Sequence, residues 1–252
     1  MGHIFDIKSA ELYEAWQKSR EGIFIDRSSN ELIVRLLKPQ KGERVLDVGC
    51  GTGNHLLLFY RLGLDTTGID ASPYMLDAAR SRLGDKTSLY IGRAEDLPFE
   101  DNEFDLVTII NTLEFLDDPL IALREAGRVA RDRIFLGVFN GFSFGCICEK
   151  LSAIFGKSIF GSMHLLTLWG IKNYTRKAYG NVDIEWESAQ LTPLFFRKYA
   201  AGADPLSSLR PNPFGYFLGI TVKMIYTLKP EELKATERLR KGRETLIGSP
   251  GF

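Results

Sequence analysis

The chain has 252 residues, 44% of them hydrophobic, and it carries 32 acidic and 32 basic side chains. This balance gives no overall field to attract a phosphate backbone, so nucleic acid is not expected as the main partner. Three cysteines are too few for a disulfide framework, and the first residues lack a signal-peptide pattern, so we expect a cytoplasmic protein.

The N-terminal segment has the pattern of two amphipathic helices, at residues 10–19 and 30–38. Tyr13 and Trp16 lie on one side of the first helix, and Phe24 is expected in the loop between the two helices. Aromatic residues at this spacing either cover a bound ligand or pack into the core, and the sequence leaves both interpretations open.

Residues 44–54, with the sequence R-V-L-D-V-G-C-G-T-G-N, predict a buried strand, a glycine-rich turn and the start of a helix. Three glycines, Gly49, Gly51 and Gly53, crowd the turn. Glycine has no Cβ, so it permits positive φ and the close approach of a ligand to the backbone. The turn would therefore present a ligand to the free N–H groups at the start of the helix.

Asp47 is an acidic residue inside this otherwise apolar strand. A buried carboxylate costs several kcal/mol unless it has a partner. We expect Asp47 either to hold the amides of the glycine loop or to face a bound cation.

The next strand, residues 64–70, ends in an acidic residue, Asp70. Asp70 stands 17 positions after Gly53, close to the ~20-residue offset at which an acidic residue meets the two hydroxyls of a ribose. The alternative is a solvated acidic residue in a loop. A helix follows, with Ser72 as its N-cap and Gly84 at its end.

Two further strands are expected at residues 88–92 and 104–110. The four motifs D-V-G-C-G-T-G-N, G-I-D-A-S, G-R-A-E-D-L-P-F and F-D-L-V-T-I-I-N-T-L-E-F resemble the successive motifs of class I S-adenosylmethionine-dependent methyltransferases. They are most similar to the small-molecule type that includes the ubiquinone/menaquinone methyltransferases. The resemblance implies an α/β fold with a Rossmann-like seven-stranded, mostly parallel sheet, helices on both faces and S-adenosyl-L-methionine as cofactor, with S-adenosyl-L-homocysteine as product.

The resemblance also implies roles for particular residues. The glycines would lie against the methionine part of the cofactor, and Asp70 would bind the ribose. Arg93 stands where many relatives have Asp, so the adenine contact would fall to Glu95 or Asp96. The cofactor-binding residues expected in this way are Asp47, Gly49, Cys50, Gly51, Gly53, Asp70, Ala71, Ala94, Glu95, Asp96, Asn111 and Thr112. Asn111 and Thr112 would lie near the acceptor as well.

The spacing of the glycines argues against a dinucleotide oxidoreductase. A dinucleotide-binding turn has the pattern G-x-G-x-x-G, whereas Gly53 comes one position early for it. A third alternative is a protein of the same fold that binds the cofactor without transferring methyl.

The second half of the chain continues with a helix that begins at Pro119 and a strand at residues 133–140. Residues 141–164 follow the fifth strand and are rich in Phe and Gly. In this fold class ligands bind at the carboxyl edge of the sheet, so this helical insertion either covers the acceptor or simply covers the core. A covering of this composition favours a small, apolar or aromatic acceptor.

The rest of the chain supplies a last helix and strands at residues 182–188 and 215–228. The role of the loop at 189–214 is left open. The expected organisation is one domain: N-terminal helices at 1–43, a cofactor-binding half at 44–140, the acceptor cap at 141–170, the last helix and strands at 171–230, and a C-terminal tail at 231–252.

No residue is assigned firmly to catalysis, because methyl transfer is an in-line displacement that depends mainly on alignment of the two reactants. His164 is a candidate base, and Glu114 a candidate for orienting the acceptor or capping a helix. No metal site is expected. Lys157 and His164 interrupt the longest apolar stretch, which argues against membrane insertion.

Overall fold

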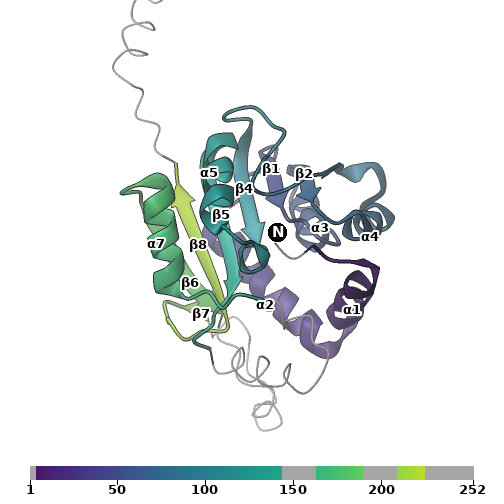
Figure 1. Cartoon of the computed structure of the whole chain (residues 1–252), viewed down its shortest axis with the longest axis horizontal. Helices are drawn as coiled ribbons and strands as arrows, with labels where there is room; N and C mark the ends of the chain where they lie inside the picture. Colours follow the sequence, from purple (N-terminus) through teal and green to yellow (C-terminus); the bar gives the residue numbers. More distant parts are fainter. Residues whose placement is uncertain (1–3, 144–162, 190–208, 225–252) are drawn as a thin grey trace, which may run out of the picture.

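The computed structural model describes residues 4–143, 163–189 and 209–224, which form one sheet with helices on both faces (Figure 1). The sheet has the strand order β3-β2-β1-β4-β5-β8-β6-β7. Its strands are β1 (Arg44–Val48), β2 (Asp65–Asp70), β3 (Ser88–Ile91), β4 (Phe104–Ile110), β5 (Ala130–Phe139), β6 (Ile184–Ala189), β7 (Leu209–Arg210) and β8 (Phe217–Lys223). The helices are α1 (Ile7–Lys18), α2 (Arg20–Leu37), α3 (Asn54–Arg61), α4 (Pro73–Leu83), α5 (Pro119–Val129) and α7 (Leu168–Tyr179), with 3-10 turns η1 (Gly84–Lys86) and η2 (Leu113–Phe115).

The first five strands are parallel, and β8 runs antiparallel to both of its neighbours, β5 and β6. The predicted seven-stranded, mostly parallel sheet is therefore confirmed, and the two-residue strand β7 adds an edge that the sequence did not predict. The strand order reverses between β1 and β4, the place where sheets of this class bind ligands.

Alternation along the strands divides the core between the two faces of the sheet. In β1, Val45 packs with α2 and α3, whereas Leu46 and Val48 pack with α5 and α7. In β4, the adjacent residues Leu106 and Val107 likewise pack on opposite faces of the sheet. A sheet buried on both faces in this way needs the continuous apolar runs from which these strands were predicted.

The N-terminal prediction is wrong in its boundaries. Only Ser19 separates α1 from α2, so Phe24 lies within α2 and not in a loop. Ser19 ends the first helix and also caps the second, because its side chain accepts a hydrogen bond from the amide of Gly22 at 3.0 Å. Residues 20–29 contain no proline to prevent the early start.

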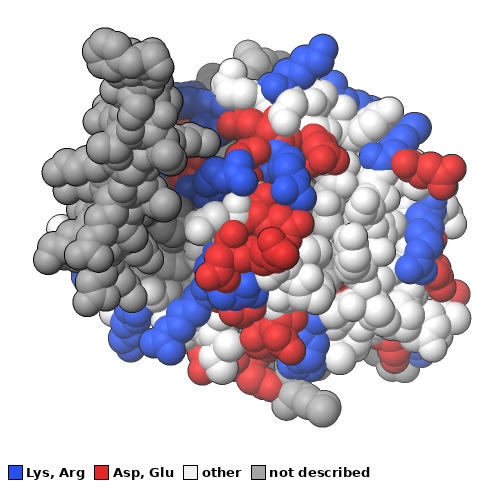
Figure 2. Space-filling view, turned by 90° about the horizontal axis from the view of Figure 1, so that it is seen from above, with Lys and Arg blue, Asp and Glu red and all other residues white. Residues whose placement is uncertain are grey.

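Most of the candidate acceptor cap, the loop at 189–214 and the C-terminal tail lie outside the described residues. None of the described helices combines the length and the apolar character that a bilayer crossing requires. On the face displayed in Figure 2, acidic and basic side chains are interspersed, and no large area of one sign is visible among the described residues.

Candidate cofactor and acceptor site

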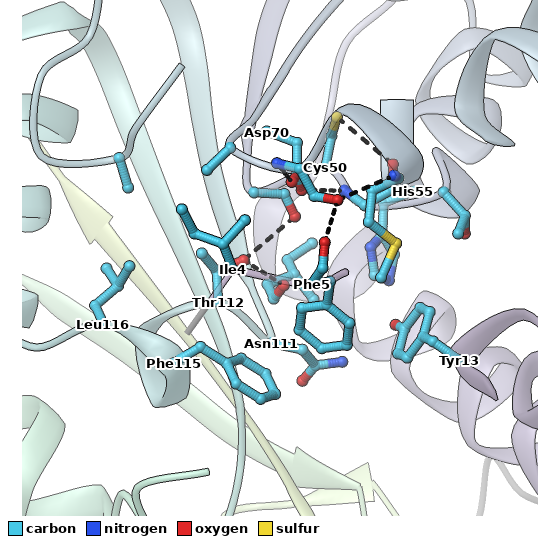
Figure 3. A pocket seen from close by; sticks show the side chains of 18 of the residues that line it. Ile4, Phe5, Tyr13, Cys50, His55, Asp70, Asn111, Thr112, Phe115 and Leu116 are labelled. Atoms are coloured by element: carbon cyan, nitrogen blue, oxygen red, sulfur yellow. Dashed lines mark hydrogen bonds between the residues drawn. The ribbon is translucent and has the colours of Figure 1, made fainter. Parts of the chain in front are cut away.

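A cavity lies at the carboxyl ends of β1, β2 and β4, where the strand order reverses (Figure 3). It contains about 1070 Å³ of space free of protein atoms, part of it open to solvent. The lining comes from the N-terminal segment, the glycine loop, the loops after β2, β3 and β4, and the end of β5.

The glycine loop adopts a conformation that requires glycine. Gly49, Gly51 and Gly53 have φ values of 72°, 53° and 78°, all in the left-handed region. The amides of Gly49 and Cys50 both donate to the carbonyl oxygen of Ile69, at 2.7 and 3.0 Å. The loop is thereby fixed to the end of β2.

Asp70 joins this loop to the cavity. Its Oδ2 accepts a hydrogen bond from the amide of Gly51, and its Oδ1 one from the amide of Ser72, each at 2.8 Å. Burial raises the pKa of Asp70, and the amide hydrogen bonds oppose that rise. The carboxylate thus orders the glycine loop while it lines the cavity (Figure 3).

Asp47 does not hold the loop amides, contrary to that interpretation of the sequence. The amides are taken by Ile69 and Asp70, whereas Asp47 Oδ1 accepts from the hydroxyl of Thr108 on β4 at 2.7 Å. Asp47 Oδ2 has no hydrogen-bond partner among the described residues. Desolvation by burial raises the pKa of Asp47 to about 7, although the Thr108 bond lowers it.

The cavity brings together most of the residues expected at the cofactor. Among the described residues, the lining includes Gly49, Cys50, Gly51, Asp70, Ala71, Ala94, Glu95, Asn111 and Thr112, but not Asp47, Gly53 or Asp96.

Gly53 and Asp96, which do not line the cavity, lie against other parts of the protein. A Cβ on Gly53 would meet Leu83 of α4 at 2.7 Å, and Asp96 pairs through its backbone with Arg93. Of the two candidates for the adenine contact, only Glu95 borders the cavity, and its Oε1 lies 3.2 Å from the guanidinium of Arg93.

The sequence left open whether Tyr13 and Trp16 of the first helix cover a ligand, and it indicated no such role for the rest of the N-terminal segment. Ile4, Phe5, Tyr13 and Gln17 are all in the wall. Each of the two interpretations of the first helix holds for one of its aromatic residues. Tyr13 lines the cavity, whereas Trp16 packs against the buried cluster on the α2 side.

Hydrogen bonds hold the N-terminal segment on the glycine loop and on the loop after β2. The hydroxyl of Ser72 donates to the carbonyl oxygen of Phe5 at 2.6 Å. The hydroxyl of Thr52, in the glycine loop, donates to Gln17 Oε1 at 2.8 Å and accepts from Arg82 of α4 at 3.1 Å. The wall formed by α1 is therefore coupled to the loops that carry Gly51 and Asp70.

Two titratable residues of the wall are neutral. Burial raises the pKa of Tyr13 to about 12 and lowers the pKa of His55, so the phenol keeps its proton and the imidazole is uncharged near pH 7. Burial also holds the pKa of the Cys50 thiol well above its usual value. Cys50 is therefore a protonated thiol and a poor nucleophile.

Neither candidate catalytic residue borders the cavity. His164 is exposed. Glu114 is fully buried in η2, where its Oε1 accepts from the amide of Phe139 at 2.9 Å. Desolvation raises the pKa of Glu114 to about 7. Glu114 thus connects η2 to β5 and does not line the cavity.

In the part of the chain that the structure describes, no three His, Cys, Asp or Glu side chains are grouped so that they could hold a metal ion.

Comparison with known proteins agrees with this geometry. Residues 46–135 match the family model described as a methyltransferase domain. The chain is 36% identical to the demethylmenaquinone methyltransferase of Staphylococcus aureus over 131 residues, which are 50% of this chain and 49% of the relative. The chain spans about half the length of the curated relatives it matches.

Two solved structures share the fold. One is an S-adenosylmethionine-dependent methyltransferase of Thermotoga maritima, a possible histamine N-methyltransferase, with a TM-score of 0.65, 22% identity and coverage of 88% of this chain and 100% of that one. The other is the magnesium protoporphyrin IX methyltransferase of Synechocystis with bound S-adenosylhomocysteine, with a TM-score of 0.57, 14% identity and coverage of 89% and 90%.

Proposed function

We propose that this chain, a class I S-adenosylmethionine-dependent methyltransferase by its fold and sequence motifs, transfers a methyl group to a small, apolar or aromatic acceptor in the cavity described above. The observation that carries the proposal is the pairing of Gly51 with Asp70 at 2.8 Å. This hydrogen bond places the carboxylate at the end of the neighbouring strand, β2, beside the open glycine loop. A carboxylate in that position can accept hydrogen bonds from the hydroxyls of a ribose.

The lining residues fit the cofactor. Apart from Gly51 and its two chain neighbours, no described residue has an atom within 4 Å of the position that a Cβ on Gly51 would occupy, so the backbone there is accessible to a ligand. The cofactor supplies a methyl group on a positively charged sulfur. Among the described lining residues, Arg93 is the one Lys or Arg, and Glu95 pairs with its charge at 3.2 Å. An unshielded cation that would repel the sulfonium is therefore absent from the described wall.

The apolar part of the wall supports the acceptor class. Phe5, Tyr13, Phe115 and Phe139 border the cavity. Such rings bury flat apolar surface efficiently. The relative from Staphylococcus aureus, whose name specifies a quinone-type acceptor, is in keeping with this class.

The residues contribute mainly by alignment. The acceptor atom forms the new bond to carbon, the carbon–sulfur bond breaks with its electron pair remaining on sulfur, and the proton of the acceptor passes to solvent. Holding the reacting atoms ~3 Å apart and in line can supply ~7–11 kcal/mol of such a rate enhancement. We assign no general base. We further propose a cytoplasmic location, which the low cysteine content favours.

The test is transfer itself. The purified chain is incubated with cofactor that carries a radiolabelled methyl group, once with a set of small phenols and once with a cell extract, and label is measured in the extracted organic products. We expect the radiolabelled methyl group in at least one product. A chain that binds S-adenosylhomocysteine but labels nothing in a cell extract would instead be a cofactor-binding protein of this fold.

A further inference from the structure

A chain of hydrogen bonds runs from α4 through the glycine loop to α1. The guanidinium of Arg82 donates to the hydroxyl oxygen of Thr52 at 3.1 Å, and that hydroxyl donates to Gln17 Oε1 at 2.8 Å. Arg82 is itself held by the side-chain oxygen of Asn54. A guanidinium has only donors, so Thr52 must accept from Arg82 and is free to pass its own proton to Gln17. The carbonyl oxygen of the Gln17 side chain therefore faces the loop, and its NH2 group points away from it.

Tyr13 is the next member of the chain. It stands four residues before Gln17 on α1, so the two side chains lie on the same face of the helix. The hydrogen bond with the Gln17 side chain lowers the pKa of Tyr13, although burial raises that pKa to about 12. A hydrogen bond lowers the pKa of a phenol when it is donated to the phenol oxygen. Gln17 is thus the donor and Tyr13 the acceptor.

This direction leaves the proton of the Tyr13 hydroxyl for a ligand. The hydroxyl oxygen accepts from Gln17, so its proton is not used in that bond. Tyr13 lines the cavity, and Figure 3 shows its hydroxyl directed toward the cavity and away from α1. Tyr13 therefore presents a hydrogen-bond donor of fixed orientation to whatever occupies this side of the cavity.

The location of Tyr13 identifies the part of the cofactor that it would meet. Thr52 directly follows Gly51, whose amide donates to Asp70. Figure 3 shows Asp70 and Tyr13 at opposite sides of the cavity, with Cys50 and His55 between them. A cofactor that places its ribose at Asp70 and extends along the glycine loop brings its amino-acid end toward Tyr13.

The chemistry of that end selects one group. It carries an ammonium group, which has only donors, a positively charged sulfur and a carboxylate, and of these the carboxylate is the hydrogen-bond acceptor. The charges of Asp26 and Arg82 act on Tyr13 in opposite directions, so neither sign dominates around the phenol. The oriented proton of the hydroxyl is therefore the feature that distinguishes a carboxylate from the other two groups.

We propose that the hydroxyl of Tyr13 binds the carboxylate of the cofactor's amino-acid part, and that Gln17 is the positioning residue that orients this hydroxyl. The inference rests on the proposed function and adds α1 to the elements that bind the cofactor. It follows that Tyr13 distinguishes S-adenosylhomocysteine from the same molecule without its carboxylate.

The test compares these two ligands, S-adenosylhomocysteine and decarboxylated S-adenosylhomocysteine, by calorimetry on the full chain. We expect Tyr13→Phe to bind S-adenosylhomocysteine about tenfold more weakly, because a hydrogen bond to a charged acceptor is lost, and to bind the decarboxylated ligand as the unmodified chain does. An equal loss for both ligands would show a structural role only. That result, or undiminished affinity for S-adenosylhomocysteine, would overturn the proposal.

Gln17→Glu tests the orientation while Tyr13 stays in place. The new side chain has nearly the same shape and still accepts from Thr52, but its second oxygen accepts the proton of Tyr13 where the NH2 group had donated. We expect a loss for S-adenosylhomocysteine at least as large as in Tyr13→Phe, and no loss for the decarboxylated ligand. Unchanged affinity for S-adenosylhomocysteine would refute the role of Gln17. This variant also decides the matter if Tyr13→Phe does not fold.

Tyr74→Phe is the matched control. Tyr74 is exposed at the start of α4 and is not part of the cavity lining, so its hydroxyl should contribute to neither affinity. A loss in this variant equal to that in Tyr13→Phe would contradict the assignment to Tyr13.

The two proposals fail differently. A chain that binds neither ligand refutes the proposed function. A chain that binds S-adenosylhomocysteine equally well with Tyr13 or Phe at this position refutes only the role of Tyr13.

Discussion

Gly49 lies so close to Thr112 that a β-carbon on Gly49 would stand 2.3 Å from the hydroxyl oxygen of Thr112. That hydroxyl donates to the carbonyl oxygen of Ile110 at 3.0 Å and lies 3.3 Å from the carbonyl oxygen of Gly49. The contact joins the loop after β1 to the segment after β4, across the point where the strand order reverses. The glycine loop and the segment that follows β4 are therefore one packed unit.

Gly49→Ala should destabilise the fold by more than the cost of its left-handed backbone. The methyl group would collide with the side chain of Thr112, in addition to the ~1–2 kcal/mol for φ at 72°. Gly42→Ala is the matched control, since Gly42 has φ at 88° and no described residue beyond its chain neighbours has an atom within 4 Å of the position that its Cβ would occupy. Urea unfolding measures the loss in free energy of unfolding for both variants. Equal losses would mean that the contact with Thr112 does not contribute to stability.

Gly51→Ala should separate binding from folding. A methyl group there meets no atom of the described residues within 4 Å, apart from those of its chain neighbours, and extends into space that the cofactor would occupy. Stability should therefore fall only by the backbone cost of ~1–2 kcal/mol. Affinity for S-adenosylhomocysteine should fall at least about tenfold, which calorimetry would detect. Full affinity in this variant would place the cofactor elsewhere.

Asp70→Ala should weaken binding of S-adenosylhomocysteine by ~1–3 kcal/mol, because it removes the expected ribose partner and the anchor of the Gly51 amide together. Asp65→Ala, at the exposed start of the same strand, is the control and should leave affinity unchanged. If the two variants bound equally well, the ribose assignment of Asp70 would be lost.

The contribution of Asp47 and Glu114 to the stability of the fold should decrease as the pH rises from about 4 to about 7. The pKa values of Asp47 and Glu114 are both raised to about 7 by burial, so the folded state holds protons that the unfolded chain releases in this window. Each group contributes up to ~1.4 kcal/mol per pH unit, present in full at low pH and lost through pH 7.

Thermal unfolding between pH 4.5 and pH 8 measures this dependence. The variants Asp47→Asn and Glu114→Gln should each flatten the curve, since each removes one titrating group. A slope that is unchanged in both variants would assign the dependence to other residues.

Local rules of sequence predicted much of the fold. The Ser72-Pro73 start and the Gly84 end gave helix α4 correctly, and the side chain of Ser72 accepts from the amide of Met75 as an N-cap does. The motifs likewise identified the loops that surround the cavity, because glycine turns and strand-end acidic residues follow from the chemistry of adjacent residues.

These local rules could not predict contacts between segments that are far apart in the sequence. Phe5 reaches the cavity because the hydroxyl of Ser72, 67 positions away, donates to its carbonyl oxygen. The sequence left Asp47 either at the loop amides or facing a bound cation. The amides pair instead with Ile69 and Asp70, and only the packing of β1 beside β2 decides this. Nothing in the sequence shows that Oδ1 of Asn111 would be buried without a partner among the described residues.

The central claim, that the glycine loop and Asp70 bind an adenosine attached to sulfur, is tested most directly by isothermal titration calorimetry of the full chain with S-adenosylhomocysteine and, separately, with NAD. The account predicts saturable heat with one S-adenosylhomocysteine per chain and none with NAD. Heat with NAD alone, or with neither ligand, would contradict it.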